Sequence, residues 1–239
     1  MLLRGGNFPL SYAYPKELRA TRDLLRRRTH LARRRAQTPA HIQLVNMQYN
    51  LPPFPKKISY KSNRVGIAAR FADASARANI ELDLKLITHY DALLAEVELY
   101  LERNAKVDDP QTFYRLQSIP GVGRILAMTM LYEIHDLKRF PKVGDFLSYA
   151  RLVRGSHTSA GKSYAAKGDK IGNPHLKWAF SEAVPLLKRT CPEAAAFAAR
   201  HEKKHNKARA NTLLAVKLGR AVYHMLRRKE AFDQNTFLP

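Results

Sequence analysis

Cysteine and long apolar runs are nearly missing from this sequence of 239 residues. The single cysteine, Cys191, excludes an intrachain disulfide and any zinc site built from several thiolates, and we interpret it as structural. No run approaches the roughly 18 apolar residues that a membrane span needs, and the opening MLLRGGNFPL is too weakly apolar for a signal peptide. These absences predict a soluble, cytoplasmic protein with no membrane partner.

Acidic residues are also scarce, with 20 Asp and Glu against 42 Lys and Arg, and the formal net charge is +22. This imbalance indicates a polyanionic partner, most often nucleic acid and sometimes an anionic membrane surface. Since nothing else in the sequence points to a membrane, we expect nucleic acid. With 45% hydrophobic residues, the chain can bury the core of one large domain or two small ones.

A long basic helix is predicted over residues 16 to about 45, after a short strand over residues 8–14. Four arginines at helical spacing fall near one face of this helix: Arg19, Arg22, Arg26 and Arg33. One interpretation is a solvated face on a supporting helix. The choice of arginine over lysine favours contact with phosphate instead, because the guanidinium fork pairs with two phosphate oxygens at once.

A second long helix is predicted from about residue 73 to 104, after a turn or linker at 50–63 that contains three prolines. Apolar residues recur along it at the spacing of a coiled-coil seam: Leu82, Leu86, Tyr90, Leu93, Val97 and Tyr100. We therefore expect a long antiparallel helical hairpin that pairs with a second copy as a homo-oligomer. The alternative is an ordinary hairpin packed on the rest of the protein.

The C-terminal part has its own helical patterns, over about 110–118, 123–134, 142–151, 174–189, 193–205 and 208–228. Asp109 is a good N-cap for the first of them, with Pro110 at its first helical position. The predicted fold is mainly α, a long coiled-coil hairpin plus a C-terminal helical domain. We divide the chain into 1–45, a linker and coiled-coil helix at 46–106, and a C-terminal domain at 107–239.

The turn Ile119-Pro120-Gly121-Val122-Gly123 lies between two of these predicted helices, in the pattern of a helix-hairpin-helix. In such a motif the glycines, here Gly121 and Gly123, expose backbone N–H groups where the next helix begins, and the helix dipole favours a phosphate there. The contact would be to the backbone and blind to sequence. The alternative is a tight turn inside a helical bundle.

Carboxylates and histidines do not form a convincing metal site in this sequence. A two-metal nuclease needs three or four acids brought together, whereas Asp108, Asp109, Glu133 and Asp136 are explained more simply by helix capping and terminal charge. His201 and His205 stand four apart on a predicted helix, and we expect them to face solvent. We therefore predict no metal ligands and no cofactor in this chain.

Residues 148–173 are predicted to form a long loop that combines glycines, hydroxyls and cations. A serine that attacks a phosphodiester needs an exposed oxygen, a pliable backbone and cations that stabilise the added negative charge. Ser159 fits this description, with Arg151, Arg154 and Lys162 nearby in the sequence, and Ser156 is a competitor. On the chemistry alone, a phosphate-binding loop without a nucleophile is the better supported interpretation.

Several motifs follow one another along the chain: Leu2-Leu3-Arg4-Gly5-Gly6, Phe8-Pro9-Leu10, Tyr14-Pro15-Lys16, the 119–123 turn, Phe146-Leu147, Arg151-Leu152-Val153, Ser159-Ala160-Gly161-Lys162, Lys170-Ile171-Gly172-Asn173, His175-Leu176-Lys177-Trp178-Ala179, and Lys217-Leu218-Gly219-Arg220. Together they resemble the insertion-sequence transposases of the one-ten family, eleven-eleven subgroup. The resemblance covers nearly the whole chain. Lys170, which begins one of these motifs, joins the expected DNA contacts.

The resemblance implies a DNA recombinase that carries out transposition. Family members join a resolvase-like N-terminal domain, whose acidic residues hold Mg²⁺, to a coiled coil and a C-terminal domain. That last domain carries a serine that links covalently to DNA, and the family motif matches Ser159 but not Ser156. The implied partners are DNA and an element-encoded guide RNA.

One departure from the family matters, because its acidic residues would all precede Leu2. We therefore expect an N-terminally truncated transposase in which residues 1–45 are a remnant of the resolvase-like domain. The chain alone should then be unable to complete strand transfer. Two alternatives stay open: a nucleic-acid-binding fragment that acts only through its basic surface, and a structural RNA-binding protein.

Overall fold

The structure is a computed structural model that describes residues 12–153, 156–159, 162–165 and 171–238. The helices are α1 (Lys16–Gln48), α2 (Ala74–Asp108), α3 (Pro110–Gln117), α4 (Arg124–Ile134), α5 (Val143–Tyr149), α6 (Pro174–Thr190), α7 (Pro192–Lys204), α8 (Lys207–Arg228) and α9 (Gln234–Phe237). Two short strands, β1 (Ser156–Ser159) and β2 (Lys162–Ala165), and three 3₁₀ turns at Lys61–Asn63, Ala68–Arg70 and Leu137–Arg139 complete the described elements.

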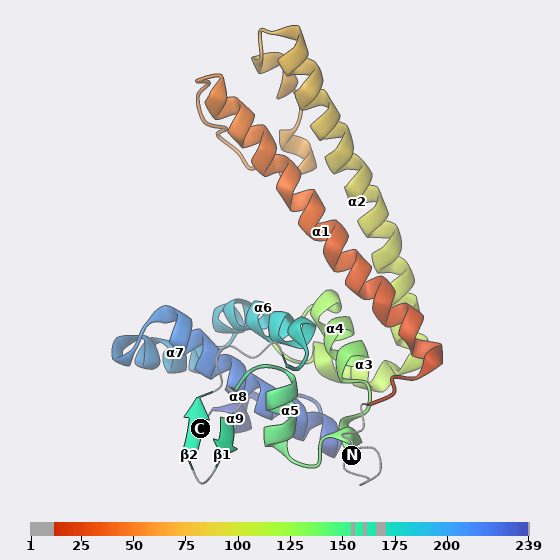
Figure 1. The fold of residues 1–239 in the computed structure, drawn as a ribbon, viewed down its shortest axis with the longest axis vertical. Coiled ribbons are helices and arrows are strands. Elements are labelled where there is room, and N and C mark those ends of the chain that lie inside the picture. The colour runs from red at the N-terminus through yellow and green to blue at the C-terminus, as the bar shows by residue number, and fades with distance from the viewer. Residues whose placement is uncertain (1–11, 154–155, 160–161, 166–170, 239) are drawn as a thin grey trace.

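Helices α1 and α2 run antiparallel and project as a stalk from a body that contains α3 to α9 (Figure 1). They have 33 and 35 residues, so at 1.5 Å per residue each is about 50 Å long. The predicted long helical pair is therefore confirmed. The helices predicted in the C-terminal part are also present, with ends within about two residues of the expected ones.

Much of the apolar seam predicted on α2 stays exposed, although Tyr90 and Leu93 are half-buried and Val97 packs against the main core. Leu82, Leu86 and Tyr100 are 59%, 47% and 54% exposed. The buried face of α2 instead includes Ile80, Asp83, Ile87, Leu94 and Leu101. Acidic residues also occupy inner positions on this face, so the apolar spacing in the sequence predicts only part of the residues that pack.

Those acidic residues are neutralised by cations of α1 and of the connection between the two helices. Arg28 Nε donates to Glu98 at 2.7 Å, and Arg35 Nε donates to Asp91 at 2.5 Å. Arg64 binds the other oxygen of Asp91 at 2.8 Å. These bonds compensate for burying carboxylates between two helices, so part of the basic charge of α1 holds the stalk together.

Two apolar clusters anchor the ends of the stalk. The outer cluster gathers side chains of α1, α2 and their connection, among them Ile42, Ile58, Phe71 and Ile80. The main core lies in the body and includes Leu25 of α1 together with Leu101 and Ala105 of α2. The foot of the stalk is thus packed into the body. The predicted boundary at 45–46 falls inside α1, and the division into domains stays a prediction.

Two local expectations need correction. The segment 148–173 is not a plain loop, because β1 and β2 pair antiparallel within it, with Ser156 opposite Ala165 and Ser159 opposite Lys162. Two short runs separated by two residues, the second a glycine, are typical of a β-hairpin. The strand predicted over 8–14 is absent at Tyr12–Tyr14, and its remainder lies outside the described residues.

No helix in the described part is long and apolar enough to span a membrane.

Gly121 allows the turn between α3 and α4 to approach α6. Its φ is +83°, and a Cβ at this position would lie 2.7 Å from the backbone of Leu186 and Leu187. Gly123, two residues later, begins α4 with φ −79° and has open space where a Cβ would be. Close packing therefore requires the first glycine but not the second.

We expect Gly121→Ser to lower the free energy of unfolding by about 2–4 kcal/mol, since a left-handed residue with a side chain costs about 1–2 kcal/mol and the clash adds to it. Gly123→Ser is the matched control, and it should be neutral or slightly stabilising because serine is a good N-cap. Urea unfolding of both variants measures the difference. Equal losses would contradict this role of Gly121.

Candidate nucleic-acid interface

The β-hairpin is anchored at both ends to the body. Arg151, just after α5, has φ +54° and donates from Nε to the carbonyl of Ile171 at 3.1 Å. The N–H of Asn173 donates to the carbonyl of Tyr149 at 2.6 Å. Gly172, with φ +96°, allows this approach, because a Cβ there would lie 2.6 Å from the same carbonyl. The segment between Arg151 and Asn173 therefore leaves and re-enters the body at one place.

Within this segment, β1 and β2 bring two predicted site residues together in the backbone. Ser159 and Lys162 are directly opposite one another at the last pair of the ladder. Arg154 and Lys170 lie outside the described residues, so their predicted phosphate contacts stay predictions. The structure describes the backbone of Ser159 and Lys162 but not their side chains, so the roles predicted for these side chains also stay predictions.

A buried carboxylate connects the hairpin segment to the stalk. Glu133 of α4 is 2% exposed, and Arg26 binds it with two hydrogen bonds of 2.7 and 2.8 Å. Asn173 donates to the same carboxylate at 2.7 Å and caps α6 by accepting from the N–H groups of His175 and Leu176. Burial opposes ionisation, but the bonds from Arg26 and Asn173 hold the pKa of Glu133 below its usual range.

The sequence predicted that Glu133 serves as a cap or terminal charge at the end of a helix, and this prediction needs correction. The three helices α1, α4 and α6 meet at this one side chain. Asp109 does cap α3, as predicted, by accepting from Thr112 N at 3.0 Å. Asp136 accepts from Lys138 N at 2.8 Å at the start of a 3₁₀ turn.

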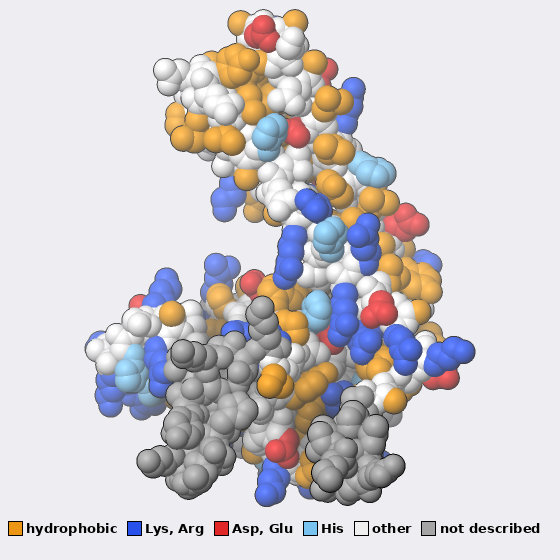
Figure 2. All heavy atoms as spheres, in the orientation of Figure 1, with side chains coloured by type: hydrophobic (Ala, Val, Ile, Leu, Met, Phe, Trp, Pro, Cys, Tyr) orange, Lys and Arg blue, Asp and Glu red, His pale blue; other side chains and the backbone are white. Residues whose placement is uncertain are grey.

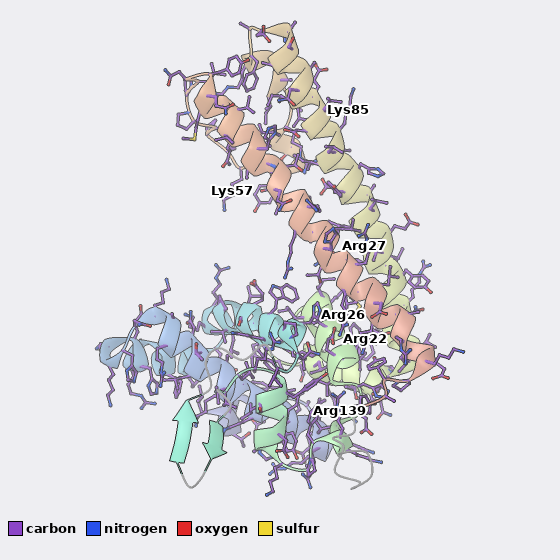
Figure 3. The ribbon with its side chains drawn as sticks, viewed as in Figure 1. Arg22, Arg26, Arg27, Lys57, Lys85 and Arg139 are labelled. Carbon is purple, nitrogen blue, oxygen red and sulfur yellow. The ribbon has the colours of Figure 1, made fainter. Side chains whose placement is uncertain are left out.

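Two other arginines predicted to contact phosphate on α1, Arg19 and Arg22, also have partners within the protein. Arg19 donates to the carbonyl of Tyr14 at 2.9 Å. The guanidinium of Arg22 lies 3.9 Å from the centre of the Tyr14 ring and 3.6 Å from Asp23. Arg22 and Arg26 both lie where α1 meets the body (Figure 3). Their contact with nucleic acid stays a prediction. In the structure, their charged groups hold α1 against neighbouring residues of the protein.

The pKa of His175, in the first turn of α6, reflects the charges around the place where α1, α4 and α6 meet. Burial lowers its pKa, and the nearby guanidiniums of Arg26, Arg33 and Arg22 lower it further, whereas Glu133 opposes them. Arg33 is exposed and has no carboxylate partner in the part of the chain that the structure describes. The inner corner between α1 and α6 is therefore a cationic surface.

The glycine turn offers one candidate anion site. Gly121 is packed against α6, so its backbone is committed to the body. Gly123 is exposed at the N-terminus of α4, and no side chain caps that helix. The first N–H groups of α4 are thus available to a phosphate in the way a helix-hairpin-helix requires.

A large share of the basic surface was missed because the sequence argument concentrated on the N-terminal helix and the hairpin segment. Residues 200–229 contain ten Lys and Arg and a single acid, Glu202. Figure 2 shows cations over the lower half of the stalk and over the α7 end of the body, while the tip of the stalk is mainly hydrophobic. A charge count in windows along the chain would have found the C-terminal cluster.

The histidines and the cysteine of the described ranges have structural positions or lie at the surface. No group of three or more His, Cys, Asp or Glu side chains there could hold a metal ion. His201 packs on the ring of Phe197, with 4.4 Å between centroids, rather than facing solvent, whereas His205 is exposed at the end of α7. Cys191 is buried between α6 and α7.

Comparison with known proteins shows what the central part of this chain is similar to. Residues 114–199, from α3 to α7, match the sequence model of the transposase IS116/IS110/IS902 family. The chain is also 31% identical over 100 residues to the transposase for insertion sequence element IS1328 of Yersinia enterocolitica. That similarity covers 41% of this chain and 30% of the relative. The segment from α3 to α7 is therefore similar to a transposase domain of the IS116/IS110/IS902 family, and the chain spans about a third of the length of the relative that it matches.

We expect Arg26→Met to lower the free energy of unfolding by about 3 kcal/mol, because it leaves the buried Glu133 carboxylate without its cation. Arg27→Met is the matched control on the same helix, since Arg27 is exposed and has no carboxylate partner among the described residues, and it should change stability by less than about 0.5 kcal/mol.

Urea unfolding at several pH values measures both variants. Because the pKa of Glu133 is lowered in the folded state, its stabilisation is present above the ordinary value of 4.5 and is lost as pH falls through the folded-state pKa. The gap between wild type and Arg26→Met should narrow over the same acid range. Equal stability of the two variants at neutral pH would contradict the role assigned to this ion pair.

Proposed function

We propose that this chain acts in DNA transposition, with Ser159 as the nucleophile on a DNA phosphodiester. The observation that carries the proposal is the anchored hairpin inside the matched transposase region, in which Ser159 is paired with Lys162 next to the turn. Both ends of the hairpin segment are fixed by the contacts of Arg151 and Asn173 with the body. A reactive hydroxyl on a protruding but anchored element suits attack on a large substrate.

In the proposed step, the Ser159 Oγ forms a bond to phosphorus while one P–O ester bond of the DNA strand breaks. The serine hydroxyl proton is lost to solvent, and the departing sugar oxygen takes up a proton. The product is a serine phosphodiester that holds one DNA end. Arg151, Arg154 and Lys162 are proposed to stabilise the negative charge that grows on the phosphate oxygens.

The remaining cations would hold the DNA on either side of this point. We propose phosphate contacts at the inner corner of α1 and α6, at the N-terminus of α4 beside Gly123, and at Lys170. The similar protein of Yersinia enterocolitica is a transposase, which supports DNA as the partner. We also propose a guide RNA as a partner, because the resemblance implies one and the same basic surface could bind it.

The resemblance also implies Mg²⁺ for the complete reaction. The described residues do not fit such a centre, because the one buried carboxylate at the junction, Glu133, is already bound by Arg26 and Asn173. No step proposed for this chain passes through a metal.

The second candidate function is a nucleic-acid-binding fragment that acts only through its basic surface. It is favoured by the arginines of α1, which serve the packing of the stalk and body as well as any ligand. The two functions differ in whether a covalent bond to DNA forms at Ser159.

We expect wild-type protein to form a covalent adduct with a suicide DNA substrate, drawn from the sequence flanking the gene and carrying a bridging sulfur at the cleaved bond. Ser159→Ala should abolish the adduct, and Ser156→Ala should retain it. Denaturing gels with labelled DNA measure the adduct, and gel shifts confirm that each variant still binds. An adduct that survives in Ser159→Ala would overturn the nucleophile. DNA binding with no adduct in any protein would favour the binding-only function.

We also propose that the apolar stripe on the outer face of α2 pairs with a second copy of this chain. Leu82, Leu86, Leu93 and Tyr100 recur at the 4-7-7 spacing of a coiled-coil seam, and all but Leu93 are exposed. A seam that remains open on an already paired helix is suited to a further helix. Self-association would bring two hairpins into one complex.

Leu82→Glu combined with Leu86→Glu should convert an oligomer to a monomer, because the added charges cannot be buried at a helix seam. Light scattering after size exclusion measures the mass. The control pair is Glu81→Gln with Lys85→Gln, exposed residues that flank the stripe. A wild-type protein that is monomeric at tens of micromolar would contradict pairing through this face.

A further inference from the structure

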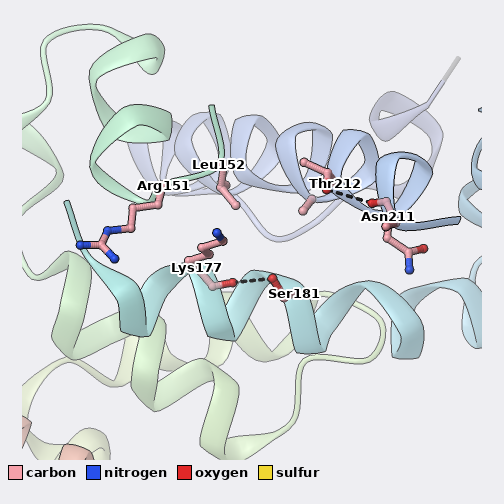
Figure 4. Close-up of a pocket in the computed structure, with 8 residues that line it drawn as sticks. Arg151, Leu152, Lys177, Ser181, Asn211 and Thr212 are labelled. Atoms are coloured by element: carbon pink, nitrogen blue, oxygen red, sulfur yellow. Dashed lines mark hydrogen bonds between the residues drawn. The ribbon is translucent and has the colours of Figure 1, made fainter. Parts of the chain in front are cut away.

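A groove of about 210 Å³ lies between α6 and α8, beside the point where the hairpin segment leaves the body (Figure 4). Its walls come from three parts of the chain that are distant in sequence: Arg151, Leu152, Lys177, Ser181, Ala208, Asn211, Thr212 and Ala215. None of these residues is acidic, and two carry a positive charge. The groove therefore favours an anion.

Arg151 lies at one end of the groove with its guanidinium directed away from Lys177 (Figure 4), and it is held in an unusual conformation. Its φ of +54° is uncommon for a residue with a long side chain, and its Nε is bound to the carbonyl of Ile171. The two terminal nitrogens of the guanidinium make no hydrogen bond within the described residues. A cation fixed by its stem with its outer donors unused is prepared for a ligand.

Two donors on facing walls complete the set. Lys177 projects from α6 into the gap toward α8, and no carboxylate within the described ranges pairs with it (Figure 4). Asn211, on α8, accepts a hydrogen bond from Lys188 Nζ at its Oδ1, at 2.7 Å. This bond fixes the orientation of the amide and leaves Nδ2 as a donor with no partner among the described residues.

The hydroxyls in the groove are already committed as donors. Ser181 Oγ donates to the carbonyl of Lys177 at 2.8 Å, and Thr212 Oγ1 donates to that of Ala208 at 2.9 Å. Neither is prepared to act as a nucleophile, because no base is in contact with it. Leu152 and Ala215 add an apolar surface suited to the carbons of a sugar.

We propose that this groove binds the sugar-phosphate backbone of the DNA strand that reaches the hairpin, through Lys177 and Asn211 on its walls and Arg151 at its end. The inference rests on the proposed function and extends it, because it assigns a path for the strand along α6 and α8. No aromatic side chain lines the groove, so it offers no stacking surface for a base. The contact reads the backbone and not the sequence.

The test measures binding of labelled single-stranded and duplex DNA as a function of salt for three proteins. Lys177→Gln and Asn211→Asp each alter one wall of the groove, and Lys85→Gln removes an exposed charge from the stalk as the matched control. We expect Lys177→Gln to weaken binding about tenfold near 100 mM salt, the equivalent of one charged hydrogen bond. It should also reduce the slope of log K against log salt by about 1.

Asn211→Asp should weaken binding at least as much, because it places on the α8 wall of the groove a carboxylate that repels phosphate. Thermal unfolding checks that the variants fold. Equal affinities and slopes for Lys177→Gln and Lys85→Gln would overturn the proposal. It would also be overturned if Lys177→Gln lost binding of inorganic phosphate, followed by calorimetry, while DNA affinity stayed unchanged, since the groove would then be a site for free anions.

These outcomes are independent of the nucleophile. If no adduct forms at Ser159 but Lys177→Gln weakens DNA binding and lowers the slope, the groove holds and the covalent step does not. If the adduct forms and Lys177→Gln behaves like Lys85→Gln, the covalent step holds and the groove does not.

Discussion

The Glu133 carboxylate is the interaction on which the arrangement of this protein depends. It is buried at the point where α1, α4 and α6 meet, and it is bound by Arg26 and Asn173. An uncompensated charge at such a place would cost several kcal/mol, so neither partner is dispensable. Because Arg26 belongs to the stalk and Asn173 ends the hairpin segment, one carboxylate fixes both elements on the body. The position of the proposed nucleophile thus depends on a residue that does no chemistry.

The net charge of +22 has two uses in this fold. Arg26, Arg28 and Arg35 neutralise carboxylates inside the stalk and at its foot. The other cations, on the inner corner of α1 and α6, in the groove beside Arg151, and along residues 200–229, are available to a polyanion. The arginines that pair with carboxylates add no net repulsion to the folded state, so only the unpaired cations repel one another. This lowers the electrostatic cost of folding a chain so rich in arginine.

Much of the fold followed from local patterns. Helices end where proline, glycine and capping residues require it, and Asp109 with Pro110 marks the start of α3 as expected. The hairpin within 148–173 was missed because its strands are short and polar and have no apolar alternation. The buried face of α2 was misassigned because Asp83, Asp91 and Glu98 break its apolar period. Which acids are buried depends on which cations face them, and that pairing is long-range.

The sequence by itself determined the helical composition, the basic character, and, through a family motif, the choice of Ser159 as the candidate nucleophile. Periodicity, capping and charge are local properties, so they can be read without a partner element. Only the tertiary structure decided that Arg26 binds Glu133, that Gly121 packs on α6, and that Lys177 and Asn211 line the same groove. Each of these joins residues far apart in the chain, and the same side chain would be a solvated charge or an open turn if its partner were elsewhere.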